Sequence, residues 1–470
     1  MKRKILYILT TLSISIIMIF TLSSCIYASK SVVSIAKTDT IGLRDIYTIT
    51  YSDGTTSTFE ITNGKDGQDA NDITVDMLFE KYLELYPDAT YKDFVNDVLD
   101  GTPQNNIDAI NKSLLSSAII YAEFTEATSE NFFNTTYDTT FHIGSSIIYK
   151  IDEEYTYFIT NYHIVYEQSS LETNKLSKKL TCYLYGSLGG PSKTESTDSS
   201  GCTIYDYGTY GITCELVGGS ITYDIAIIKA KTTDVLNINE NARGVELASG
   251  YEVGETAIAI GNPEAEGISV TQGIISVDSE TIQLSFDNTS RDFRSIRIDT
   301  AIYHGSSGGG LFNSNGELIG ITNAGDNQDQ NVNYAVPLEI VKGVTENILY
   351  YANENSITPK KILLGITVYT KESKFVYDSK TGKGKIVNTL EITQVNENSI
   401  AQKMNINLND IVKSFVINGV EHSIYRNFNI GDLILTLRPG DQISFIVTRN
   451  NETIETGKYT ILESDFINVE

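Results

Sequence analysis

Apolar positions change their spacing several times along this chain, and each change marks a different kind of segment. From about residue 110 to 350, short β-branched runs such as 157–160 and 225–228 are separated by Gly, Asn and Asp. Many short strands with such turn signals predict a β-barrel or β-sandwich. A second series of short strands occupies 358–465 and contains one run of helical spacing over 430–437. We therefore predict a mainly β protein with a separate C-terminal domain.

Residues 25–72 contain a clear hairpin signal. Apolar and polar residues alternate over 45–51 and again over 58–61, and Ser52-Asp53-Gly54 between them is typical of a turn. The polar stretch 64–70 that follows is predicted to be a linker.

The apolar spacing becomes helical over 73–105. Two runs, 74–85 and 90–99, are separated by Pro87, which cannot continue a helix. We predict a helical spacer here, and its sequence indicates no partner.

Two stretches are poor in strand signals and are predicted to be surface loops. Residues 186–210 are rich in Gly, Ser and Thr, and residues 370–388 are long and polar. The second loop is expected to modify any groove in the C-terminal domain.

The first residues have the pattern of an export signal. Three basic residues at 2–4 precede an apolar run over 5–22. The run ends in Leu22-Ser23-Ser24-Cys25, which resembles a bacterial lipobox. We predict a signal peptide over 1–24 and a lipid on Cys25. The alternative is an uncleaved membrane anchor, because about 18 apolar residues nearly span a bilayer. Both interpretations place the rest of the chain outside the cytoplasm on a membrane tether.

The composition of the chain argues against some classes of binding partner. The chain of 470 residues has 60 acidic and 35 basic residues and a net charge of −25, which argues against nucleic acid and anionic lipid headgroups. Cys182, Cys202 and Cys214 show no metal-ligand spacing, so no metal is expected. They are either one disulfide and a free thiol or three small buried residues.

Three separated motifs offer the groups that acyl transfer from a peptide needs. Ser307 stands in a glycine-rich turn, and the backbone N–H groups of Gly305, Ser306 and Ser307 are candidates for an oxyanion hole. His163 follows an apolar strand and is a candidate base, and Asp224 leads another strand and could orient it. Each motif alone has an ordinary interpretation: a flexible turn, a core histidine, or a turn-forming aspartate.

Together, the motifs resemble one family. Residues 141–340 contain, in order, Thr160-Asn161-Tyr162-His163, Asp224-Ile225-Ala226-Ile227 and Gly305-Ser306-Ser307-Gly308-Gly309. These are similar to the His, Asp and Ser motifs of HtrA (DegP/DegS-like) proteases. The resemblance implies a trypsin-like double β-barrel over 110–350 with a catalytic triad of His163, Asp224 and Ser307, and it favours Ser307 over Ser306 as nucleophile. It implies no cofactor, and it suggests a homotrimer.

The same resemblance extends to specificity and to the C-terminal domain. Ala301 would lie at the base of the specificity pocket, where a small neutral residue favours uncharged substrate side chains. Leu364, Gly365 and Ile366 resemble the carboxylate-binding loop and strand of an HtrA-type PDZ domain, which binds C-terminal peptides.

The resulting hypothesis is a lipid-anchored, extracytoplasmic serine endopeptidase that cleaves unfolded or exported proteins and recognises peptides through a PDZ-like domain. Two alternatives remain: a regulatory protease for one membrane-associated target, and a catalytically silent peptide-binding surface protein.

Overall fold

The computed structural model describes residues 32–469 except for 42–43, 53, 63–74, 88–89, 95–105, 132–133, 287–288, 326–330, 353–356 and 379–382. The chain forms two compact units, residues 1–105 and 106–470. The predicted signal peptide, Cys25 and the linker over 64–70 lie outside the described residues.

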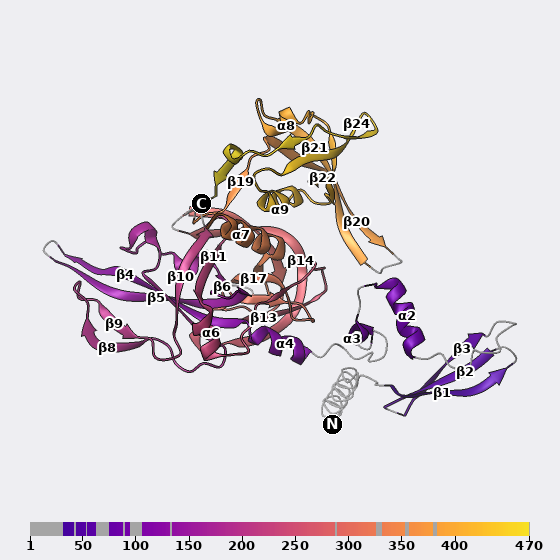
Figure 1. Cartoon of the computed structure of the whole chain (residues 1–470), viewed down its shortest axis with the longest axis horizontal. Coiled ribbons are helices and arrows are strands. Elements are labelled where there is room, and N and C mark those ends of the chain that lie inside the picture. Colours follow the sequence, from indigo (N-terminus) through magenta and orange to yellow (C-terminus); the bar gives the residue numbers. More distant parts are fainter. Residues whose placement is uncertain are drawn as a thin grey trace, which may run out of the picture. The chain divides into compact units, whose positions relative to one another are not determined.

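The described residues of the first unit form a small antiparallel sheet and two helices (Figure 1). Its elements are β1 (Val32–Ile41), β2 (Arg44–Tyr51), β3 (Thr56–Thr62), α2 (Val75–Leu85) and α3 (Tyr91–Phe94). The predicted hairpin corresponds to β2 and β3, which pair across the predicted turn. The structure adds a third strand, because β1 pairs with the other edge of β2.

The second unit begins with α4 (Asn106–Leu114) and continues into a closed barrel. Its strands, in the order β10-β11-β6-β5-β4-β7, are β4 (Ser117–Asn131), β5 (Asn134–Ile151), β6 (Tyr155–Thr160), β7 (Lys179–Leu184), β10 (Ile212–Ser220) and β11 (Ile225–Lys231). Two short helices, α5 (Tyr162–Val165) and α6 (Thr232–Ile238), follow strands of this barrel.

A second sheet follows in the order β12-β17-β16-β13-β14-β15-β18, and the pairing of β17 with β18 closes six of its strands into a second barrel. Its strands are β12 (Glu246–Leu247), β13 (Thr256–Gly261), β14 (Ser269–Phe286), β15 (Thr289–Ile298), β16 (Gly310–Phe312), β17 (Glu317–Gly325) and β18 (Asn333–Pro337). Helix α7 (Leu338–Tyr351) ends the domain. The predicted mainly β, trypsin-like double barrel is confirmed.

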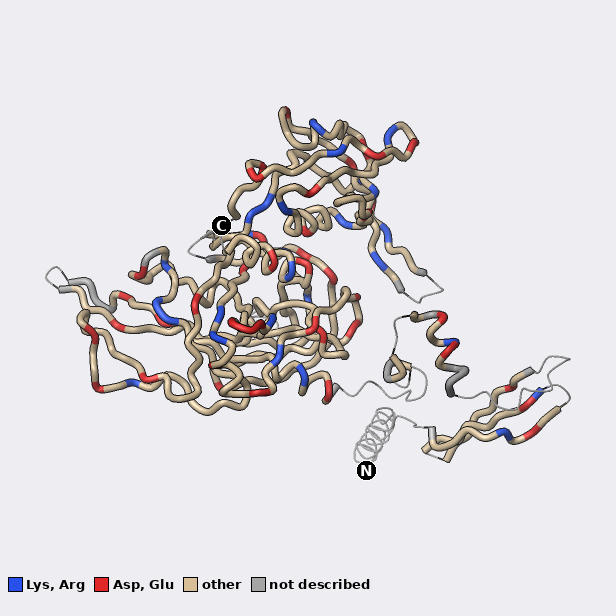
Figure 2. Tube along the Cα trace, in the orientation of Figure 1, with Lys and Arg blue, Asp and Glu red and all other residues tan. Residues whose placement is uncertain are grey.

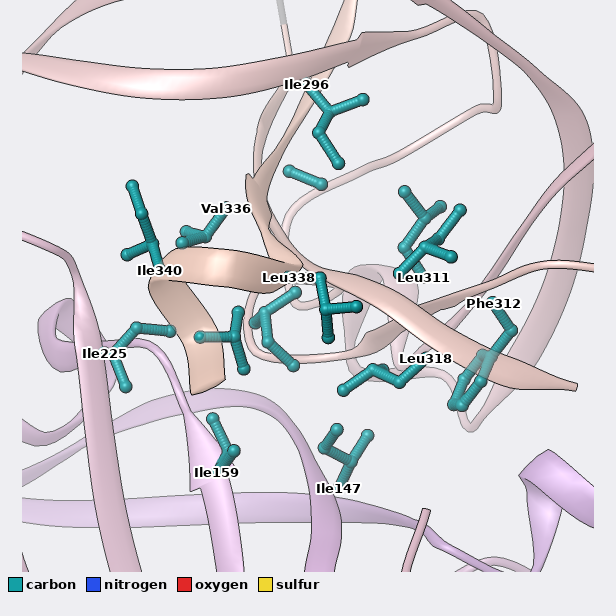
Figure 3. Packing of buried hydrophobic residues seen from close by; sticks show 14 of the residues in the cluster. Ile147, Ile159, Ile225, Ile296, Leu311, Phe312, Leu318, Val336, Leu338 and Ile340 are labelled. Atoms are coloured by element: carbon teal, nitrogen blue, oxygen red, sulfur yellow. The ribbon is translucent and has the colours of Figure 1, made fainter. Parts of the chain in front are cut away.

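One hydrophobic core joins the two barrels. Ile147 and Ile159 of the first barrel belong to the same buried cluster as Leu311, Phe312 and Leu318 of the second, as Figure 3 shows. All five side chains are fully buried. This shared core fixes the facing ends of strands from different barrels, where the candidate catalytic residues lie.

The C-terminal domain is a β-sheet with two short helices and its own core. The sheet order is β20-β21-β22-β24-β25, with β23 on β22 and β26 on β24. The strands are β19 (Lys360–Ile362), β20 (Ile366–Asp378), β21 (Lys383–Val395), β22 (Ile411–Ile417), β23 (Val420–Ser423), β24 (Gln442–Arg449), β25 (Glu452–Glu455), β26 (Tyr459–Thr460) and β27 (Phe466–Asn468). The helices are α8 (Ile400–Lys403) and α9 (Asn429–Thr436).

The prediction of a loop over 370–388 is wrong. β20 and β21 run through this stretch as an antiparallel pair, with Phe375 opposite Ile386 and Val376 opposite Lys385. Aromatic and β-branched residues favour strands, and they are frequent enough here to outweigh the polar composition. The other predicted loop, 186–210, is largely exposed but contains a two-stranded hairpin of β8 (Ser192–Thr197) and β9 (Thr203–Asp206).

Helix α9 contacts the protease-like domain as well as its own core. Asn347 Nδ2 of α7 donates to the Leu435 carbonyl at 2.9 Å, and Leu435 is buried in the double-barrel core. Ile430 is buried in the C-terminal core. The apolar helix is therefore shared between two cores.

Candidate active site

Pairing between two strands of the first barrel brings His163 and Asp224 together. β6 and β11 are antiparallel, with Thr160 opposite Ala226, so residues just after β6 lie beside residues just before β11. His163 Nδ1 is 2.9 Å from Asp224 Oδ2, and the backbone N–H of His163 donates to Asp224 Oδ1 at 3.0 Å. The carboxylate therefore fixes both the ring and the backbone of the histidine.

Asp224 is held from several directions. Its side chain is 1% exposed, and its backbone has the left-handed φ of 51°, which is uncommon for a non-glycine residue. Asn161 Nδ2 donates to its carbonyl at 2.8 Å, and Asn323 Nδ2 donates to Oδ2 at 3.0 Å. Asn161 therefore fixes the backbone of Asp224, whereas Asn323 supplies a donor to one oxygen of its buried carboxylate.

The environment of His163 changes its basicity. Burial lowers the pKa of His163, but the charge of Asp224 and the hydrogen bond that His163 donates to that carboxylate more than offset it, so the pKa lies above the ordinary value of 6.5. The imidazolium that forms during proton transfer is the state that Asp224 stabilises.

The structure separates the two candidate serines. Ser306 is 7% exposed, and its Oγ accepts the Tyr303 N–H at 3.4 Å. Ser307 is only partly buried, and its Oγ donates to the Asn323 carbonyl at 3.1 Å. Asn323 thus contacts Ser307 through its backbone and Asp224 through its side chain. Ser307 is therefore the serine that is connected to the His163–Asp224 pair through Asn323.

Close backbone packing holds the serine turn. The Ser145 N–H donates to the Ser307 carbonyl at 2.8 Å. Gly308 has a φ of 86°, and a Cβ there would overlap the Ser145 carbonyl and Thr160 Oγ1. Only glycine fits this conformation and this space.

Two of the three predicted oxyanion donors remain available. The Ser306 N–H donates to the Tyr303 carbonyl at 3.0 Å and is therefore occupied. Within the described residues, the N–H groups of Gly305 and Ser307 have no intramolecular acceptor. Backbone donors without a partner beside a nucleophile are the arrangement that stabilises a tetrahedral oxyanion.

Ala301 lines a narrow pocket that borders the serine turn at Ser306. The side chains around this pocket are uncharged. They belong to Ala259, Ile260, Gly261, Pro263, Ser269, Thr271, Ala301, Tyr303, Ser306 and Thr322. Thr271 Oγ1 donates to the Ala301 carbonyl at 2.8 Å and fixes this wall.

The residues predicted to bind peptides start the edge strand of the C-terminal sheet. Gly365 has a φ of 75°, and a Cβ there would overlap Ser399 at the start of α8. The Ala401 N–H donates to the Leu364 carbonyl at 2.9 Å. Ile366 begins β20, which has a strand neighbour on one side only among the described residues. The open edge can accept an extended peptide.

Residues 139–321 match a protein family described as a trypsin-like peptidase domain. The double barrel described above agrees with this match.

Three relatives of the chain are all named as serine proteases or serine endoproteases. It is 27% identical over 319 residues to "Serine protease Do-like HtrA" of Bacillus subtilis (strain 168), covering 63% of this chain and 60% of that protein. It is 30% identical over 245 residues to "Periplasmic serine endoprotease DegP" of Salmonella typhimurium, covering 51% and 47%. It is 28% identical over 257 residues to "Serine endoprotease DegS" of Escherichia coli (strain K12), covering 53% and 66%. The trypsin-like domain is thus similar to HtrA-type serine proteases, and the chain spans about 60% of the Bacillus relative's length.

A solved structure described as "HtrA-type protease AlgW with decapeptide" has 20% sequence identity and a TM-score of 0.46, covering 76% of this chain and 99% of that one.

Sequence reasoning assigned no role to Asn323. Its signal was a polar residue close to the end of the buried run of β17, where a side chain can reach the neighbouring barrel.

His142 was also missed. Its Nδ1 is 3.1 Å from the His163 carbonyl, and its Nε2 pairs with Glu167 at 3.0 Å. His142 therefore contacts the backbone of His163 and is itself held by Glu167.

Cys182, Cys202 and Cys214 are free and buried, which agrees with the interpretation as small core residues. Across the described segments, helices fall short of the length and apolar character that crossing a bilayer requires.

Proposed function

We propose that this protein is a membrane-tethered, extracytoplasmic serine endopeptidase of HtrA type that cleaves unfolded or exported proteins. The observation that carries the proposal is the connection of His163, Asp224 and Ser307 through Asn323. The names of the DegP-type relatives support a location outside the cytoplasm, and the sequence over 1–25 supports the lipid tether.

The proposed mechanism follows from the hydrogen bonds. Ser307 turns its hydroxyl from the Asn323 carbonyl toward the substrate and attacks the scissile carbonyl, while His163 takes its proton. Asp224 holds Nδ1–H and stabilises the imidazolium, and the N–H groups of Gly305 and Ser307 bind the developing oxyanion. His163 then protonates the leaving amine, and water cleaves the acyl-enzyme.

The C-terminal domain is proposed to recognise peptide C-termini at the open edge of β20, beside Leu364, Gly365 and Ile366. Strand addition provides backbone hydrogen bonds, and the turn before the strand provides N–H groups for a carboxylate.

A fluorophosphonate probe tests the nucleophile. The wild-type protein is expected to be labelled, Ser307→Ala to lose the label, and the matched control Ser306→Ala to keep it. Label that persists in Ser307→Ala overturns the assignment of the nucleophile. If no form is labelled and no unfolded protein is cleaved, the catalytically silent alternative is favoured.

A further inference from the structure

β20 and β21 continue past their pairing with β22 as a two-stranded ribbon, and the base of this ribbon contacts Tyr425 through the Asn388 N–H and Lys385. β21 pairs with β22 only at Leu390 and Glu391, whereas β20 and β21 pair with each other through to Asp378 and Lys383. The ribbon beyond this point extends roughly 20 Å at the usual rise per strand residue. An isolated two-stranded ribbon is only marginally stable in water. Because backbone pairing alone stabilises such a ribbon only weakly, a partner bound to its side chains would stabilise it.

One face of the ribbon is apolar and exposed. Phe375 and Tyr377 are two residues apart on β20, and Ile386 lies opposite Phe375, so all three point to the same side. Their exposed fractions are 69%, 61% and 37%. A Cβ at Gly384 would overlap the Phe375 ring, so the ring lies over this glycine. Glycine at this position leaves the ring space to lie flat on the ribbon.

The other face carries lysines and one acid. Lys374 and Lys385 flank Val376 there, and Glu372 stands two residues before Lys374. Lys371 is paired with Glu391 at 3.1 Å. Figure 2 shows blue segments, which mark Lys or Arg, along this ribbon. Lys385 lies 3.4 Å from the Tyr425 ring centroid, while Lys374 forms no ion pair with any described residue. In the rest of the chain, by contrast, acidic residues outnumber basic residues.

We propose that the ribbon of β20 and β21 docks on an anionic lipid surface. Phe375, Tyr377 and Ile386 enter the headgroup region, and the lysine stems extend past the ribbon edge to lipid phosphates. Aromatic rings and lysines are the residues that favour this interface.

The net charge of −25 opposes an anionic surface at long range. Salt screens exposed charges beyond about 8 Å at physiological ionic strength, so the contact depends on the lysines of the ribbon itself. A protein partner fits less well, because a stable protein interface buries roughly 800 Å² on each side, more than three side chains offer.

The absence of tryptophan from the chain gives a clean test in the full-length protein. Phe375→Trp creates a single fluorophore on the apolar face. Its emission is expected to shift to the blue with vesicles containing phosphatidylglycerol and to be quenched by brominated acyl chains. Phosphatidylcholine vesicles are expected to give no shift. The shift is expected to be lost in high salt and in the double variant with Lys374→Glu.

Two matched controls accompany it. Leu188→Trp places the fluorophore on another side chain that is 78% exposed, and Lys193→Glu makes the same charge change on β8, away from the ribbon. Neither change is expected to reproduce or abolish the Phe375→Trp response.

Several outcomes overturn the proposal. These are no shift with anionic vesicles, an equal shift from Leu188→Trp, a shift that follows protein concentration without vesicles, and a shift produced by unfolded protein instead of lipid. The third outcome indicates a second copy of the chain on the ribbon, and the fourth indicates substrate.

Discussion

At the scale of single residues, the candidate site depends on how a buried carboxylate is satisfied. Asp224 accepts hydrogen bonds from the ring and backbone of His163 and from Asn323. Removing the charge leaves the histidine without a fixed tautomer and without a counterion.

Asp224→Asn tests this arrangement. We expect kcat/KM for a peptide to fall about 10⁴-fold, as when the same change is made in a Ser-His-Asp triad. In the wild type, kcat/KM is expected to rise with pH through the pKa of His163, which lies above 6.5, because only the neutral ring accepts the serine proton. In Asp224→Asn, the midpoint of the pH profile is expected to fall, because the carboxylate no longer raises the pKa of His163. An unchanged pH midpoint in Asp224→Asn contradicts the role given to the carboxylate.

Ala301 carries a second prediction at this scale. The uncharged lining of its pocket favours cleavage after small or aliphatic residues, since a buried cation there would lack a partner. A peptide library with products read by mass spectrometry measures this preference, and Ala301→Asp is expected to shift cleavage toward Lys and Arg. A wild-type protein that cuts only after Lys or Arg is incompatible with the prediction.

At the scale of elements, the serine turn lies where strands from both barrels meet. β5 supplies the donor to the Ser307 carbonyl, and β17 supplies the Asn323 carbonyl that accepts from the Ser307 hydroxyl. The turn is therefore held by strands on both sides instead of by its own sequence.

Gly308→Ala measures how tightly the turn is packed. The change combines a left-handed φ with overlap against Ser145 and Thr160. The control Gly186→Ala has a φ of 85° but no atom within 4 Å of the added Cβ. The control is expected to cost about 1–2 kcal/mol of unfolding free energy, which is the backbone cost alone. Gly308→Ala is expected to cost clearly more in urea unfolding and to remove fluorophosphonate labelling. Equal costs for the two variants would mean that the turn can relax.

At the scale of the whole second unit, two ion pairs between described residues join the C-terminal domain to the trypsin-like domain. Arg294 of β15 donates to Asp432 of α9 at 2.8 Å, and Arg426 donates to Asp278 at 2.5 Å. Burial raises the pKa of Asp432 to about 7, although Arg294 opposes the shift.

This pair predicts a pH dependence of stability. A carboxyl whose pKa is raised on folding stabilises the folded state most below its unfolded pKa, and this contribution is lost as pH rises through the folded value. The urea midpoint is therefore expected to fall as pH rises from about 4 through about 7, and Asp432→Asn is expected to flatten this fall. Asp278→Asn, which removes the more exposed interdomain carboxylate, serves as control. A fall of the same size in Asp432→Asn contradicts the prediction.

The sequence by itself determined the fold class, the two barrels of short strands and the candidate triad, because strand periodicity, turn residues and ordered motifs are local signals. It also located the helical run that became α9. It failed at 370–388, where pairing between β20 and β21 outweighed a polar composition. Only the tertiary structure decided which N–H groups stay open and that Asn323 connects Ser307 with Asp224. Those outcomes depend on contacts between strands distant in the chain, and no local pattern records such contacts.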